Sequence, residues 1–172
     1  MLQQPSRALP IALILLIIIG TGTIIYAISF ETRSVLKETI QQNLRSTAGI
    51  AASEIDGDAF AQLQPGDENS AAFLRVRDQL NRIRDSDPNI LYIYTMRLSG
   101  GTAEFVVDAD YGIDSDSPGI GQIYTNAEPE LIAGFTGPSA DNEFTTDQWG
   151  SVLSGFSPIR DSTGTHEKSY GR

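Results

Sequence analysis

The sequence predicts an α+β fold in which an N-terminal transmembrane helix leads into a long helix packed on an antiparallel sheet. Three observations carry this prediction. Residues 10–30 are apolar and hold no charged side chain. Apolar residues then recur at three- and four-residue steps, first within residues 31–56 and again within 70–84, which is the spacing of one helical face. From residue 90 onward the chain is rich in β-branched and aromatic residues separated by short turns, which is typical of strands.

The apolar segment 10–30 is long enough to cross a membrane, because a helix of roughly 20 residues spans a hydrocarbon core of about 30 Å. A cleaved signal peptide is the alternative, with Ala27 and Ser29 at the −3 and −1 positions of the cleavage site. The apolar run is longer than the usual signal core of about 7–15 residues, which favours an uncleaved anchor. Under either interpretation the remainder of the chain is exported.

The balance of positive charge does not orient this segment, since Arg7 precedes it while Arg33, Lys37 and Arg45 follow it. We expect a cytoplasmic N-terminus because an N-terminal apolar segment normally acts as an export signal. All 22 acidic residues follow Phe30 and the net charge is −10, which argues against a nucleic-acid partner. The expected division is a cytoplasmic N-terminus (1–9), a transmembrane helix (10–30), a juxtamembrane helix (31–56), a folded domain (57–164) and an irregular tail (165–172).

Residues 31–56 are expected to continue the membrane helix outward. One face of that helix carries Leu36, Ile40, Leu44, Ala48, Ala51 and Ile55. Such a stripe packs on the helix's own domain or forms the seam of a homodimer, and the two roles can coexist.

A second helix is predicted after a short segment at 59–63 and a turn at Pro65-Gly66-Asp67. Asn69 or Ser70 is able to cap it. Its buried stripe comprises Phe73, Val76, Leu80 and Ile83, while Arg75, Arg77, Arg82 and Arg84 are expected on a solvated face. The polar run 85–89 ends it.

Two strands, 90–98 and 102–107, are predicted to pair antiparallel across the turn Ser99-Gly100-Gly101. An acidic loop (108–122), a short helix (128–135) and a third strand (149–157) follow. The turn at 160–164 calls for a returning strand of about five or six residues, but residues 165–172 are polar. We therefore expect the last strand of the sheet to be missing and the chain to be truncated.

The sequence offers no catalytic site, and we expect no enzyme activity and no cofactor. It has no cysteine, and its single histidine, His166, lies in the polar tail, which argues against a histidine-based triad or a histidine-based metal site. Asp108, Asp110, Asp114 and Asp116 cluster, but their spacing lacks the glycine and the final glutamate of an EF-hand loop. No metal site is predicted.

The order of elements and several short segments resemble the extracytoplasmic PAS-like (Cache) sensor domain of prokaryotic receptors, which precedes histidine kinases, cyclases and diguanylate cyclases. The resemblance covers about residues 30–164. It is carried by Ile55-Asp56, residues 90–95 (ILYIYT), residues 105–110 (FVVDAD), Pro118-Gly119, residues 147–150 (DQWG) and residues 154–159 (SGFSPI).

This resemblance implies a five-stranded antiparallel sheet backed by the long helix, with a small-molecule pocket between the sheet and residues 108–135. An amino acid or a small carboxylate is the ligand expected by analogy. The second membrane helix and the output module of such receptors are absent from this sequence. The expected function is therefore an anchored sensor domain from a larger receptor; the alternative is a self-sufficient anchored protein that modulates a partner receptor.

The residues themselves offer candidates for the pocket, each with a structural alternative. Tyr92 and Tyr94 share one strand face and either contact a ligand or fill the core. Arg97, on the other face, either clamps a carboxylate or lies on the surface. Asp108 binds an amine or caps a turn, and Trp149 stacks on a ligand or fills the core. The complete expected set is Tyr92, Tyr94, Arg97, Asp108, Asp110, Trp149 and Ser154.

Overall fold

The computed structural model describes residues 8–125, 127–147, 150–164 and 168–169. The chain divides into two compact units, Met1–Ile40 and Gln41–Arg172. Helix α1 (Ala8–Glu54) begins in the first unit and ends in the second without a break, as the sequence predicts.

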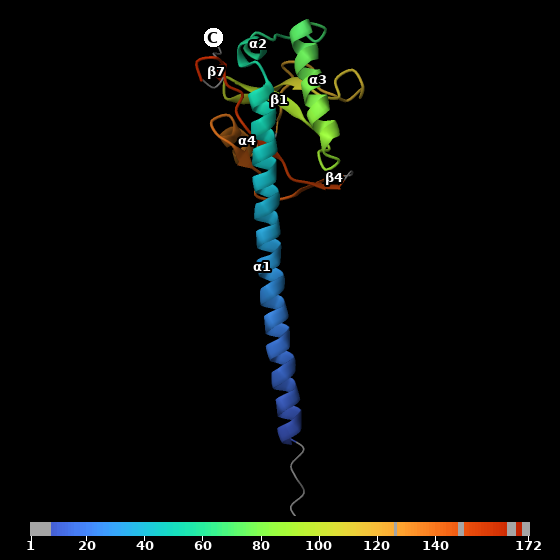
Figure 1. Ribbon diagram of the computed structural model, residues 1–172, viewed down its shortest axis with the longest axis vertical. Helices are drawn as coiled ribbons and strands as arrows, with labels where there is room; N and C mark the ends of the chain where they lie inside the picture. Colours follow the sequence, from blue (N-terminus) through green and yellow to red (C-terminus); the bar gives the residue numbers. More distant parts are fainter. Residues whose placement is uncertain (1–7, 126, 148–149, 165–167, 170–172) are drawn as a thin grey trace, which may run out of the picture. The chain divides into compact units, whose positions relative to one another are not determined.

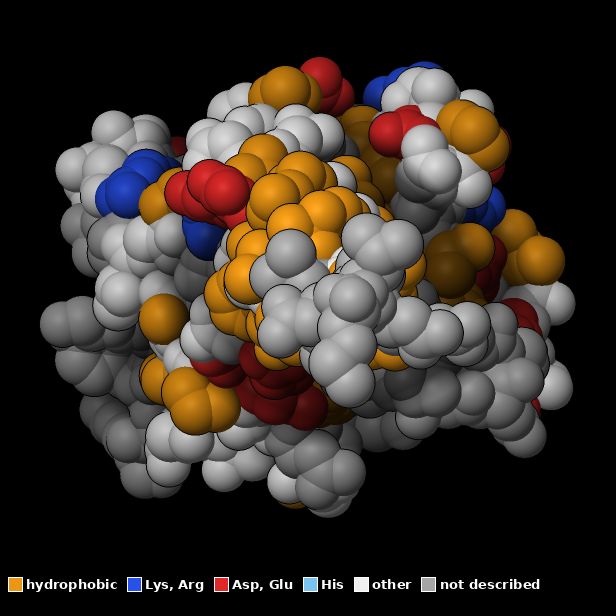
Figure 2. Space-filling view, turned by 90° about the horizontal axis from the view of Figure 1, so that it is seen from below, with side chains coloured by type: hydrophobic (Ala, Val, Ile, Leu, Met, Phe, Trp, Pro, Cys, Tyr) orange, Lys and Arg blue, Asp and Glu red, His pale blue; other side chains and the backbone are white. Residues whose placement is uncertain are grey.

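In the first unit, α1 is exposed and apolar throughout residues 10–30, and hydrophobic side chains gather at its near end in Figure 2. Thr21 and Thr23 donate their hydroxyls to the carbonyls of Ile17 and Ile19, so these polar groups are satisfied within the helix. Among the described residues, α1 is the one helix long and apolar enough to cross a membrane; its most apolar window has a mean hydropathy of 2.6. A signal sequence near an N-terminus has the same properties.

The second unit contains two more helices early in the chain, α2 (Gly57–Ala61) and α3 (Ala71–Ser86). Asp56 caps α2 through Ala59 N–H, and Ser70, one of the two predicted caps, accepts from Phe73 N–H. The predicted stripe is confirmed for Phe73, Val76 and Leu80, which are buried, whereas Ile83 is half-buried. In Figure 1, α3 runs beside the last turns of α1.

The predicted hairpin is confirmed as β1 (Tyr94–Ser99) and β2 (Thr102–Asp108). Its turn is made by Gly100 and Gly101, both with positive φ, a conformation that favours glycine. The expected strand start at residue 90 is wrong, because the register pairs Tyr94 with Asp108 and β2 ends there. A bulge between Thr95 and Met96 shifts the register within the hairpin.

The later part of the chain differs from the predicted five-stranded sheet. After helix α4 (Pro129–Gly134), the strands β3 (Ser139–Ala140) and β6 (Gly155–Phe156) pair with each other, as do β4 (Thr145–Asp147) and β5 (Gly150–Val152). The single strand predicted at 149–157 is thus two short strands in two sheets. The hairpin joins instead a three-stranded sheet of order β2-β1-β7, in which β7 (Lys168–Ser169) lies parallel to β1.

The hydrophobic core lies between α2, α3 and one face of β2. It is built from Ile55, Phe60, Leu63, Phe73, Val76, Leu80, Val106, Val107, Ala109 and Ile120. Arg84, expected on a solvated face, instead pairs with Asp110, and Asn81 donates to the carbonyl of Ala109 at 2.8 Å. These bonds tie α3 to the beginning of the acidic loop.

Gly57 is required where α2 meets the chain near Arg160. A Cβ atom at Gly57 would lie 2.1 Å from the carbonyl oxygen of Arg160 and 2.5 Å from its carbonyl carbon. Both atoms are backbone, so no side-chain rotation relieves the clash. We expect Gly57→Ala to lower the free energy of unfolding by about 1–3 kcal/mol, measured by denaturant titration.

Gly137→Ala is the matched control for this substitution. Nothing lies within 4 Å of a Cβ atom at Gly137, and its φ is not in the left-handed region. Stability equal to that of the parent is expected there. Equal stability of the two variants would contradict the close approach of residue 160 to α2.

Candidate functional site

Three aromatic rings gather on the side of the hairpin that carries Tyr94. The rings of Tyr94 and Phe105 lie 5.2 Å apart, and those of Phe105 and Tyr124 lie 5.7 Å apart, both edge to face. Met96 pairs with Phe105 in the register, so residues of both strands meet on this face. Together the rings of Tyr94, Phe105 and Tyr124 form an aromatic cluster.

Tyr124 reaches the aromatic cluster because its segment adds to the outer edge of β2. Phe105 N–H donates to the Gln122 carbonyl at 2.9 Å, and Gly121 N–H donates to the Phe105 carbonyl at 2.8 Å. Tyr124 N–H then donates to the Ala103 carbonyl at 2.9 Å. These ladder-like bonds bring a loop residue to the sheet and hold its ring beside Phe105.

Asp141, directly after β3, and Arg97 are the two described residues with a buried side-chain polar atom that lacks a hydrogen-bond partner. Asp141 is only 8% exposed. Its Oδ2 accepts from Ser154 N–H at 2.8 Å, and its own N–H donates to the Ser154 carbonyl at 2.9 Å. The other carboxyl oxygen, Oδ1, is buried and has no hydrogen-bond partner within the described chain. A buried acceptor without a donor costs about 1–3 kcal/mol, so this oxygen requires an explanation.

Asp141 is also joined to helix α1. Gln41, a buried residue in the last third of α1, donates its side-chain Nε2 to the Asp141 carbonyl at 2.7 Å. Gly155, which pairs with Ala140, approaches α1 so closely that a Cβ there would lie 2.7 Å from the backbone of Leu44. A displacement of the β3–β6 pair would therefore also move residues 41–44 of the helix or break their contacts with it.

The aromatic cluster lies in a negative environment. Burial raises the pKa of the Tyr94 phenol, and the charges of Asp141, Glu128 and Asp108 raise it further. Burial likewise raises the pKa of Tyr124, with added effects of Glu128 and Asp141. Both phenols therefore remain neutral at physiological pH.

Asp108 ends β2, and its half-buried carboxylate accepts from Asp110 N–H at 2.7 Å. Burial raises its pKa above the ordinary value of 3.8. The folded chain therefore holds this proton more tightly than the unfolded chain, and ionisation of Asp108 lowers stability as the pH rises through that interval.

We expect Asp108→Asn to remove this loss. An asparagine oxygen still accepts from Asp110 N–H, so the turn is retained. The variant is expected to be more stable than the parent at pH 7 by less than about 1 kcal/mol, since Asp108 is only half-buried. The difference should vanish below pH 3.8. Melting temperatures from pH 3 to 8 provide the measurement, and a loss of stability at pH 7 would contradict it.

The expected site residues are only partly brought together. Tyr94 lies in the aromatic cluster, and Asp108 is close enough to affect its pKa. Ser154 contributes backbone bonds to Asp141 rather than its hydroxyl. Tyr92 is exposed before β1 begins, and Asp110 is engaged by Arg84. Trp149 lies outside the described residues.

Arg97 lies apart from the aromatic cluster, as the alternation of side chains along a strand requires. It is buried, and its Nη2 donates to the carbonyl of Leu63 at 2.5 Å, while its Nε has no partner in the described chain. Its position next to a core residue places it on neither the surface nor the Tyr94 face. Arg97 is thus not available to clamp a ligand carboxylate beside Tyr94.

The expected set of site residues does not include Asp141, Phe105, Tyr124 or Glu128. Phe105 could be identified from the sequence, because pairing the two predicted strands across the glycine turn places it opposite Met96. Asp141 and Tyr124 lie in segments without periodicity, and nothing in their neighbours distinguishes them from other loop residues. Glu128 was placed in the predicted helix, but its proximity to the sheet is a tertiary feature.

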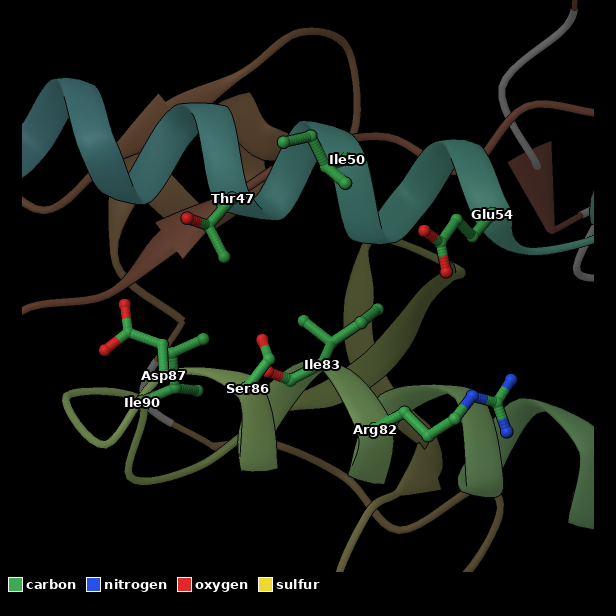
Figure 3. A pocket seen from close by; sticks show the side chains of 8 residues that line it. All are labelled: Thr47, Ile50, Glu54, Arg82, Ile83, Ser86, Asp87 and Ile90. Carbon is green, nitrogen blue, oxygen red and sulfur yellow. The ribbon is translucent and has the colours of Figure 1, made fainter.

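A separate groove of about 460 Å³ lies between α1 and α3 and shares no residue with the aromatic cluster. Figure 3 shows side chains of both helices directed toward it: Thr47, Ile50 and Glu54 from α1, and Arg82, Ile83, Ser86, Asp87 and Ile90 from α3 and the turn after it. Ile50 is 60% exposed there. The part of the chain that the structure describes contains no cluster of side chains suited to a metal ion.

No family model, no curated protein and no solved structure matches the chain.

Proposed function

We propose that the chain is a membrane-anchored, extracytoplasmic sensor domain of PAS-like type that binds a small molecule and passes the event to its membrane helix. The observation that carries the proposal is Asp141, whose buried oxygen Oδ1 lacks a hydrogen-bond donor. The charge of Asp141 also acts on the phenols of Tyr94 and Tyr124 in the aromatic cluster. Buried sites that combine apolar rings with a few placed polar groups are typical of small-ligand pockets. A bound ligand would supply the missing donor.

The connection to α1 supports the signalling part of the proposal. Asp141 is bonded to Gln41, and Gln41 belongs to the same unbroken helix as the apolar segment. A ligand that binds one conformation of β3 and β6 better than another shifts the population of the helix positions that go with them. A ligand that bound both equally would transmit nothing.

Ligand screening of the full chain in lipid nanodiscs tests the proposal. Amino acids, small carboxylates and small amines are added singly, and the melting temperature is recorded. We expect at least one compound to raise it in a saturable manner, and a Gln41→Ala variant to bind that compound while losing any ligand-dependent change near the membrane helix. Absence of saturable binding by any member of such a panel would contradict a sensor role.

A homodimer along residues 31–56 is part of the same proposal. The groove beside Ile50 holds both Glu54 and Arg82, so two copies related by a twofold axis would each offer one charge to the other. Since the chain has no cysteine, Ile50→Cys introduces a single thiol. We expect it to form a disulfide-linked dimer in membranes.

Ile113→Cys controls for random collision, because Ile113 is 74% exposed in the acidic loop. Little crosslinking is expected there. Equal crosslinking of the two variants would argue for the alternative function, an anchored protein that acts on a different partner through this groove.

A further inference from the structure

We propose that the ligand of this site is a small molecule bearing a protonated primary or secondary amine, held by Asp141 Oδ1 and the aromatic cluster. This inference rests on the proposed ligand-binding function and specifies the chemistry of its ligand. It excludes the carboxylate ligands expected by analogy.

The missing hydrogen bond at Asp141 defines the first requirement. Oδ2 is satisfied by Ser154 N–H, whereas Oδ1 is buried and accepts nothing within the described chain. An ionised carboxylate is an acceptor only, so its partner must bring a donor. A protonated amine supplies an N–H and a positive charge together, and such charge-assisted bonds are about twice as strong as neutral ones. A quaternary ammonium has no N–H and leaves Oδ1 unsatisfied.

The second requirement, a positive charge on the ligand, follows from the charges and rings around Asp141. Besides Asp141, the carboxylates of Glu128 and Asp108 act on the phenols of the aromatic cluster. Arg97 lies against Leu63, and Arg84 is paired with Asp110. A ligand carboxylate would be repelled by the three carboxylates of Asp141, Glu128 and Asp108. The rings, in contrast, attract a cation through their quadrupoles.

The third requirement, a conformational change on binding, follows from the burial of Oδ1. Because this oxygen is inaccessible to solvent, an amine reaches it only if one of the covering elements moves. Asp141 belongs to the β3–β6 region, which contacts α1 at Gln41 and Leu44. Binding at Asp141 is therefore coupled to a change at the helix, as a sensor requires.

Three compounds of equal chain length but different charge test the inference: putrescine, 1,4-butanediol and succinate. Isothermal titration of the full chain in nanodiscs should show saturable binding of putrescine and none of the other two. Binding of succinate or butanediol without putrescine would overturn the amine assignment and leave the sensor proposal intact. Binding of none of them, nor of any amine in a wider panel, would overturn the assignment too; the sensor proposal fails with it only if no other class of compound binds.

Two variants locate the binding. Asp141→Asn should weaken putrescine binding at least about tenfold, because a hydrogen bond to a charged group is lost. Without ligand, this variant should melt no lower than the parent, since it removes a buried charge with an unsatisfied oxygen. A lower melting temperature with unchanged affinity would show a structural role and overturn the inference.

Glu128→Gln tests the charge of the site without changing the buried residue Asp141. Glu128 is exposed at the N-terminus of α4, and its side chain makes no capping hydrogen bond, so the fold should tolerate the change. We expect a weakening of putrescine binding by a few-fold that disappears at high salt, because the charge acts through solvent. Unchanged affinity in both Asp141→Asn and Glu128→Gln would place any amine site elsewhere.

Discussion

Phe73→Ala is expected to lower the free energy of unfolding of the second unit by about 3–5 kcal/mol, the range for removing a large aromatic side chain from a core. Phe73 is 0% exposed and lies in the centre of the cluster formed by α2, α3 and β2. Its ring also meets that of Tyr111 edge to face, with centroids 5.2 Å apart. The substitution therefore leaves a cavity and also loosens the beginning of the acidic loop.

Denaturant titration followed by circular dichroism measures this effect. Phe73→Leu retains most of the volume and should cost clearly less. Ile113→Ala changes an exposed apolar residue in the loop and should alter stability by no more than about 0.5 kcal/mol. If Phe73→Ala were as stable as Ile113→Ala, the packing of α3 on β2 would be wrong.

The position of Phe73 was itself predictable from the sequence. The stripe of Phe73, Val76 and Leu80 has a helical period, and Ser70 provides a cap at the correct distance. The hairpin was predictable for a similar reason, because two consecutive glycines with positive φ fit a two-residue turn. These features are local, and local spacing is what a sequence displays directly.

The predictions that were wrong concern features that depend on partners distant in the sequence. Residues 90–93 have strand composition, but β2 ends at Asp108, which pairs with Tyr94. Ile93 accepts one further hydrogen bond, from Ala109 N–H to its carbonyl, and β2 provides no partner for residues 90–92. Residues 150–156 split into two strands because each half pairs with a different segment. Asp141 became a site residue only through Ser154, Gln41 and the aromatic cluster, none of which is its neighbour in sequence.

The apolar half of α1 provides the second large effect. In a cell fractionation, the full chain should remain in the membrane pellet after alkaline carbonate extraction, and a variant with Leu16→Arg and Ile19→Arg should appear in the soluble fraction. Each arginine near the centre of a spanning helix costs about 2.5–3.5 kcal/mol on the insertion scale. Each leucine or isoleucine gains only about 0.3–0.6 kcal/mol, so two arginines cancel most of the gain of the segment.

A matched pair of arginines outside the apolar segment shows whether charge alone causes the release. Val35→Arg with Leu36→Arg changes two exposed residues of the same helix and should leave the chain in the pellet. The intact mass of the extracted chain then separates an anchor from a signal peptide, because cleavage after Ser29 removes the apolar segment. Retention of the N-terminal residues places the anchor on the same helix as Gln41, and the hydrogen bond from Gln41 to Asp141 then joins the ligand site to a helix that ends in the membrane. Cleavage would remove that route and leave a free exported binding domain.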